Sequence, residues 1–307
     1  MAKVNFEELL DAGVHFGHLK RKWNPNMAPY IFMERNGIHI IDLYKTMAKI
    51  DEASAALKQI AKSGKKVLFV ATKKQAKEIV AEHVRHINMP YVTERWPGGM
   101  LTNFATIRKA VRKMSQIDKM VNSPTFQNIS KRERLQITRE RAKLEKNLGS
   151  IADLNRLPSA VFVVDILKEH IAVAEAHKLN IPTFAIVDTN SNPNEVDFPI
   201  PANDDASKSI DLIMRVMVQA IEEGLNDRKL DRDKQEEEHE EFETGDTRIS
   251  IDDFETEDES IIPVVPIDII DTPRIQKVKV ITEGENDESL RKAAPKKATV
   301  RKPSIKK

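Results

Sequence analysis

The chain has 307 residues, of which 40% are hydrophobic and 32% are charged, and it contains no cysteine. This composition supports one good core and leaves charged sequence that cannot be buried. The lack of cysteine excludes disulfides and thiolate metal sites. No apolar run of about 18 residues exists and the N-terminus has no apolar signal core, so we expect a cytoplasmic protein.

The formal net charge of +1 hides an uneven distribution. Residues 1–226 carry 33 Lys and Arg against 26 Asp and Glu, whereas residues 227–307 carry 16 against 22. We therefore divide the chain into a basic globular domain, 1–226, and a charged tail, 227–307. A basic surface by itself indicates a nucleic-acid partner only weakly, because many solvated surfaces look alike.

The first candidate binding residues lie near the N-terminus, where Lys20, Arg21 and Lys22 immediately precede Trp23. Cations beside an indole suit an RNA backbone, with the ring free to stack on a base. A solvated charge run with the tryptophan in the core explains the pattern equally well. Both interpretations stay open on these residues alone.

Short apolar runs that alternate with helical patterns predict an α/β fold. Between Pro158 and Pro201, two continuously apolar runs flank an amphipathic helix, which is typical of a parallel βαβ unit covered on both faces. A last helix begins after Asn203 and should end near Gly224. The predicted strands of a five-stranded parallel sheet are residues 38–41, 67–71, 91–94, 161–165 and 183–187.

Cations also follow two of these strands. Lys73 and Lys74 come directly after the strand at 67–71, where a helix N-terminus would expose amides to an anion. Arg95 and Trp96 stand before Gly98, in a corner that lets the main chain approach RNA closely or simply forms a tight turn. No phosphate-cradling glycine pattern occurs, which argues against a nucleotide-binding enzyme.

From residue 104 to residue 151 the pattern changes to two helical stripes separated by a turn signal. We predict an inserted antiparallel helical hairpin resembling a coiled coil. Between Arg108 and Lys146 it carries 12 basic residues against four acidic ones, which suits it to lie against a polyanion. The cations at its start are Arg108, Lys109, Arg112 and Lys113.

The tail falls into three parts. Residues 231–259 hold 15 acidic and three basic residues and should be disordered. Residues 261–281 are apolar but interrupted by prolines, and residues 291–307 hold eight basic residues and no acid. We expect the domain 1–226 to fold without the tail.

An enzyme is the rival interpretation. Asp165 and Asp188 both end central strands, where α/β enzymes bind ligands, and the polar loop after Asp188 could chelate Mg²⁺. No nucleophile–base pair or complete metal set accompanies them. His15 and His18 stand three residues apart without further ligands, so we take them as packed imidazoles and expect no metal or other cofactor.

Several segments closely resemble the bacterial second protein of the small ribosomal subunit, the S-two family. In order they cover nearly all of residues 3–226 and together are highly specific for that family. The matching segments are GVHFGHLKRKWNPNMAPYIF (13–32), RNGIHIIDLYKT (35–46), LFVATK (68–73), RWPGGMLTNF (95–104) and the long run from Phe162 to Ala206.

The resemblance implies a flavodoxin-like parallel sheet with an inserted helical hairpin. It also implies a non-enzymatic role: binding small-subunit ribosomal RNA at the head–body junction and supporting the mRNA-binding protein S-one, among neighbouring ribosomal proteins. The tail departs from the family's usual short acidic end. We predict RNA contacts from Lys20, Arg21, Lys22, Trp23, Lys73, Lys74, Arg95, Trp96, Arg108, Lys109, Arg112 and Lys113, because the cations gather without matching acids.

Overall fold

The computed structural model describes residues 4–124, 126 and 129–245, with side chains as far as residue 234. The part of the acidic segment after residue 245, the proline-interrupted segment and the basic end therefore lie outside the described residues. Within the described part of the chain, no helix is long and apolar enough to cross a membrane.

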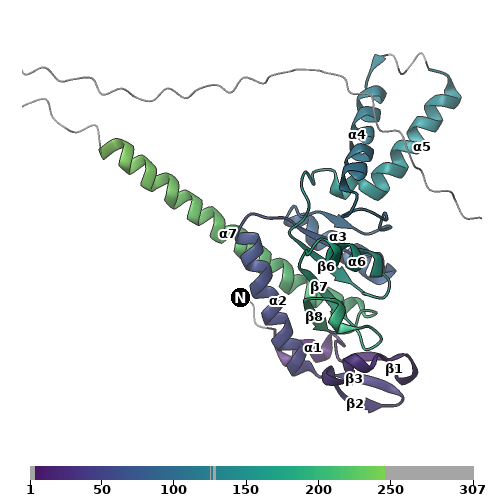
Figure 1. Cartoon of the computed structure of the whole chain (residues 1–307), viewed down its shortest axis with the longest axis vertical. Coiled ribbons are helices and arrows are strands. Elements are labelled where there is room, and N and C mark those ends of the chain that lie inside the picture. Colours follow the sequence, from purple (N-terminus) through teal and green to yellow (C-terminus); the bar gives the residue numbers. More distant parts are fainter. Residues whose placement is uncertain (1–3, 125, 127–128, 246–307) are drawn as a thin grey trace, which may run out of the picture. The chain divides into compact units, whose positions relative to one another are not determined.

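A five-stranded parallel sheet forms the centre of the fold (Figure 1). All four neighbouring pairs of strands are parallel. Numbered along the chain, the spatial order is second, first, third, fourth, fifth, which is the flavodoxin-like order. The predicted α/β class is confirmed. In spatial order the strands are β5 (Tyr91–Val92), β4 (Val67–Val70), β6 (Ala160–Val164), β7 (Thr183–Val187) and β8 (Phe198–Pro201).

The fifth strand is β8, so the prediction that residues 38–41 belong to this sheet is wrong. Ile38–Ile41 is β3, the middle of a separate antiparallel sheet with β1 (Phe16–Leu19) and β2 (Ile31–Arg35). Its burial alternates, as expected where one face of an antiparallel sheet meets solvent. The strand β8 was not predicted because Pro199 and Pro201 interrupt its apolar pattern, and prolines are tolerated at a sheet edge.

Helices cover both faces of the parallel sheet. Successive residues of a strand point to opposite faces, so Phe69, Phe162 and Phe184 pack into one core, and Val70 and Val163 into the other. Burial on both faces explains why these strands are continuously apolar. The first core includes α2 (Leu43–Lys62), α3 (Lys74–His86) and α7 (Ser207–Gly245), and the second includes α6 (His170–Lys178).

The last helix, α7, runs through Gly224 to Gly245, so the predicted end near Gly224 is wrong. The predicted disorder of the acidic segment is wrong for residues 231–245, which continue this helix. A Cβ at Gly224 would lie 2.4 Å from the carbonyl oxygen of Lys58 on α2. The glycine therefore allows the two helices to approach closely rather than ending one of them. Lys58 also pairs with Asp227 at 3.1 Å, within the region assigned to the tail. Independent folding of residues 1–226 stays a prediction.

The segment expected to form a helical hairpin contains α4 (Phe104–Val121) and α5 (Lys131–Leu148). Ion pairs join them: Lys113 of α4 pairs with Glu140 of α5, and Asp118 pairs with Arg141. On α4, Val111, Met114 and Ile117 are buried, at intervals of three residues. Coiled-coil-like packing of the pair stays a prediction.

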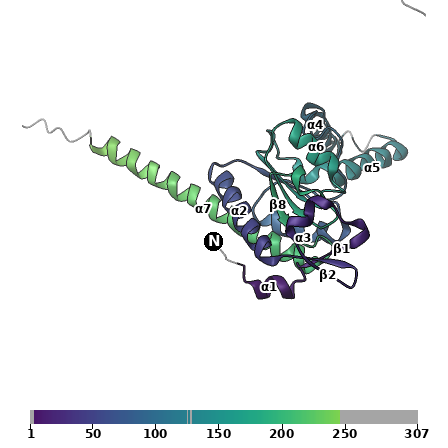
Figure 2. The same cartoon turned by 60° about the horizontal axis from the view of Figure 1, so that its bottom comes forward.

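The small antiparallel sheet lies against the loops at the carboxyl edge of the parallel sheet, next to β8 (Figure 2). The amide of His18 donates to Thr189 Oγ1 at 2.8 Å, and the amide of Asn24 donates to Thr189 O at 2.8 Å. A Cβ at Gly17 would lie 2.6 Å from the side chain of Thr189, so only glycine allows this approach. These contacts bring the basic N-terminal segment to the strand ends.

Candidate nucleic-acid interface

The carboxyl edge of the parallel sheet collects most of the predicted binding residues. Because the strands are parallel, the loops that follow β4, β5, β6, β7 and β8 all leave from this edge. Lys73 and Lys74 follow β4, Arg95 follows β5, and the N-terminal segment is held beside them by Thr189.

In the N-terminal segment, Lys20, Arg21 and Lys22 form a short 3-10 turn, and all three side chains are exposed. Lys20 pairs with Glu34 at 2.6 Å, so its charge is matched. Arg21 and Lys22 make no ion pair within the described chain. Trp23 is 37% exposed, and its ring lies 5.1 Å from that of His39. Part of its surface is available for stacking.

Lys73 contradicts the expectation of unmatched charge. Its ammonium lies 2.6 Å from Asp205, 2.8 Å from Asp204 and 3.6 Å from Asp165, and its side chain is only 12% exposed. Burial by itself lowers the pKa of Lys73, but the hydrogen bonds to Asp204 and Asp205 outweigh it and raise the pKa. Lys73 links three loops, whereas the neighbouring Lys74 is exposed.

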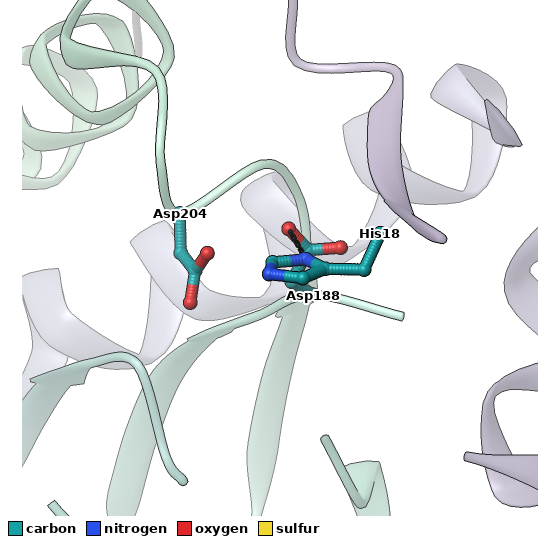
Figure 3. Close-up of side chains that lie close together, drawn as sticks. All are labelled: His18, Asp188 and Asp204. Atoms are coloured by element: carbon teal, nitrogen blue, oxygen red, sulfur yellow. Dashed lines mark ion pairs between the residues drawn. The ribbon is translucent and has the colours of Figure 1, made fainter. Parts of the chain in front are cut away.

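His18, Asp188 and Asp204 lie close together (Figure 3). Asp204 is also one of the partners of Lys73. His18 Nδ1 lies 2.9 Å from Asp188 Oδ2, and Asp204 Oδ2 is buried without a hydrogen-bond partner among the described residues. Each residue offers a ligand atom within 4.8 Å of the others, so the three could hold a divalent cation. From the sequence, His15 was considered as a second ligand beside His18. In the structure His18 lies with Asp188 and Asp204 instead, and the ring of His15 packs against Phe16.

The electrostatics of this cluster depend on burial. Burial and the charge of Asp188 raise the pKa of Asp204 to about 7. The hydrogen bond with Asp188 raises the pKa of His18, against the opposing effect of burial. The folded chain therefore binds more protons here than the unfolded chain.

The contribution of these two groups to stability should consequently fall as the pH rises. The contribution of His18 is complete below its ordinary pKa of 6.5 and is lost as the pH rises through the raised pKa of the folded state. Asp204 keeps its proton to about pH 7 when folded but only to 3.8 when unfolded, so it destabilises the fold increasingly between these values. Relative to the wild type, Asp204→Asn should gain Tm as the pH rises over this range, measured with a chelator present. The exposed Asp153→Asn should not, and an unchanged profile for Asp204→Asn would contradict the assignment.

Trp96 is buried, at 7% exposure, so it packs in the core instead of offering a ring to a base. Its indole donates to Glu175 at 3.2 Å, and the same carboxylate accepts from the amides of Gly99 at 2.7 Å and Leu101 at 2.9 Å. Glu175 thus holds the loop after β5 in shape, and Gly99 at φ +81° forms its tight turn. Arg95, on the same loop, remains exposed.

The four cations on α4 differ in their surroundings. Arg108 donates to the carbonyl of Leu154 at 3.1 Å, and Lys113 pairs with Glu140, so both link parts of the protein. Lys109 and Arg112 are exposed. The predicted side chains that are exposed and make no ion pair with a described residue are Arg21, Lys22, Lys74, Arg95, Lys109 and Arg112.

Comparisons with known proteins identify the family to which the chain is similar. The family model described as "Ribosomal protein S2" matches residues 9–224. A "Small ribosomal subunit protein uS2" of Phocaeicola vulgatus is 72% identical over 232 residues, covering 76% of this chain and 83% of the relative. The proteins of that name from Parabacteroides distasonis and Flavobacterium johnsoniae are 69% and 70% identical, covering 76% and 75% of this chain and 84% and 91% of theirs. The chain belongs to the ribosomal protein S2 family.

Proposed function

We propose that this chain is a structural constituent of the small ribosomal subunit that binds small-subunit ribosomal RNA at the head–body junction and supports docking of the mRNA-binding protein S-one. The family is one of structural ribosomal proteins, so the chain is not an enzyme. Its partners are ribosomal RNA and neighbouring ribosomal proteins, and its place is the cytoplasmic ribosome.

One observation supports the RNA part most strongly. Six exposed Lys and Arg side chains that make no ion pair with a described residue lie at the carboxyl edge, on the N-terminal turn and along α4. Cations left without partners are the ones that can neutralise phosphates and release counterions. We assign the RNA contacts to these six and to Trp23. We assign Lys73, Trp96 and Arg108 to holding the surface in shape.

Sedimentation with ribosomal subunits tests this function. The purified chain, added to small subunits depleted of their S2-family protein, should co-sediment with them at about one copy per subunit. A chain that stays at the top of the gradient at low salt, where phosphate contacts are strongest, would contradict the proposal.

An apolar hollow of about 300 Å³ supports the docking of S-one. It lies between α1 (Phe6–Asp11), β2 and the start of α2, and Phe32 and Tyr44 on its rim are 70% and 73% exposed. The ring of Phe6 stacks on that of Tyr44 at 5.1 Å. Exposed aromatic side chains around a hollow are typical of a surface that binds another protein, and we assign it to S-one.

Replacing Phe32 by Ser should weaken S-one binding to subunits roughly 30-fold, which is the effect of removing an aromatic side chain that becomes buried in a complex. Because Phe32 is largely exposed in the chain alone, the fold should be unaffected. The measurement is the amount of S-one retained on reconstituted subunits. Leu230→Ser, at an exposed leucine on α7 outside the hollow, is the control. Equal retention by the two variants would remove the hollow from the docking surface.

A further inference from the structure

The opposite edge of the parallel sheet, where its strands begin, carries a second group of cations. Strands β5, β4, β6 and β7 lie side by side in this order and run parallel. The segments that lead into them therefore lie along one edge of the sheet. Lys65 and Lys66 lead into β4, and Arg156 precedes β6 by four residues. None of these residues belongs to the carboxyl-edge surface described above.

Four hollows follow one another along this edge. The largest, about 510 Å³, lies between the end of α3 and α7 and shares Asn88 with a second. The second shares Lys66 with a third, and the third shares Lys65 with the fourth. Among the described residues, their lining includes seven Lys or Arg side chains and two carboxylates, those of Asp153 and Glu222. We call this surface the basic amino edge.

Helix dipoles explain only part of this charge. Arg85 and His86 lie in the last turn of α3, where a cation stabilises the helix, and Arg85 also donates to the hydroxyl of Tyr91 at 2.9 Å. Lys65 and Arg156 lie in loops. Both are exposed, and neither makes an ion pair with a described residue.

The cations on α7 extend the same surface. Arg228 and Lys229 line the largest hollow, well inside a helix that continues to Gly245, so no helix terminus accounts for them. The guanidinium of Arg228 lies against Gly64, close to the loop that carries Lys65. The positive charge is therefore spread over several hollows and does not converge on one of them.

We propose that the basic amino edge binds the sugar–phosphate backbone of small-subunit ribosomal RNA, as a second RNA contact separate from the carboxyl edge. This inference rests on the proposed function. Cations spaced along a hollowed strip match a polyanion with regularly spaced phosphates, whereas a single small anion would need them to converge. An acidic protein segment is the competing occupant, and the experiment separates the two.

The test uses the full chain and small-subunit ribosomal RNA transcribed in vitro. The variant Lys65→Gln/Arg156→Gln removes two charges from the basic amino edge. The control Lys208→Gln/Arg215→Gln removes one lysine and one arginine that are equally exposed and unpaired within the described chain, on α7 outside the hollows. The dissociation constant is measured over a range of KCl concentrations, and the Tm of each variant checks its folding.

We expect the slope of log K against log[KCl] to become shallower by about 1.4 to 1.8 for the basic-edge variant, since each lost phosphate contact accounts for 0.7 to 0.9. The control should keep the wild-type slope. Wild-type binding together with an unchanged slope for the variant overturns the inference and leaves the proposed function standing. Absence of wild-type binding overturns the proposed function itself. If the variant binds RNA normally but reconstituted subunits that contain it lose a neighbouring protein, the inference is overturned. The occupant of the basic amino edge is then an acidic protein.

Discussion

Reversing the charges of Lys22, Lys74, Arg95 and Arg112 to Glu should sharply reduce incorporation into small subunits while leaving the Tm close to that of the wild type. The four side chains are exposed and make no ion pair within the described chain, so their reversal breaks no ion pair there. Each lost phosphate contact should reduce the salt dependence of RNA binding by about 0.7 to 0.9 log units per log[salt]. Four contacts together should reduce it by about 3.

Two comparisons make this result specific. Reversing Lys208 and Arg215, which are also exposed and unpaired within the described chain, should change the slope little. Lys73→Glu should instead unfold or destabilise the chain, because the side chain lies among three aspartates, of which Asp204 is fully buried, and would add a fourth acid to them. Unchanged incorporation of the fourfold variant would remove the carboxyl edge from the RNA-binding surface.

Gly224→Ala should destabilise the fold, although alanine normally favours a helix over glycine by about 1 kcal/mol. The added Cβ would meet the carbonyl of Lys58 at 2.4 Å, and the methyl group of Ala61 at 3.0 Å. Because a backbone atom cannot move aside cheaply, α2 and α7 must separate. Overpacking of this kind typically costs about 1 to 3 kcal/mol, which corresponds to a Tm lower by roughly 2 to 12 °C.

Gly149→Ala is the matched control. Gly149 has helical backbone angles, and a Cβ there would make an ordinary contact of 3.6 Å with Glu145. Its Tm should therefore stay the same or rise slightly. The thermal midpoints of the two variants are compared by circular dichroism. A Tm for Gly224→Ala at or above that of the wild type would show that α2 and α7 do not pack as closely as described.

The distant pairings of the candidate site could not be predicted from local patterns. Lys73, Trp96 and Lys113 were selected because each stands among basic or aromatic neighbours in the chain. Their partners lie far away: Asp204 is 131 residues from Lys73, and Glu175 is 79 residues from Trp96. A local window reports the charge of a segment but not the acids that the fold brings to it.

What the sequence by itself determined is the layered α/β architecture. Continuous apolar runs such as Val161–Val164 have no polar side, so they must be buried on both faces, and helices must supply the cover. The same regularity located β4, β6 and β7 within one residue of their observed bounds. The segments that resemble the S-two family indicated to which family the chain belongs.

Only the tertiary structure decided which strand completes the sheet, how α7 continues, and which cations are available to RNA. The strand Phe198–Pro201 is interrupted by prolines that an edge position tolerates, and Gly224 is explained by a helix contact rather than by a helix end. The cluster of His18, Asp188 and Asp204 forms because two sheets meet at the carboxyl edge. Periodicity records the burial of each segment, whereas these features arise from contacts between segments that are remote in the chain.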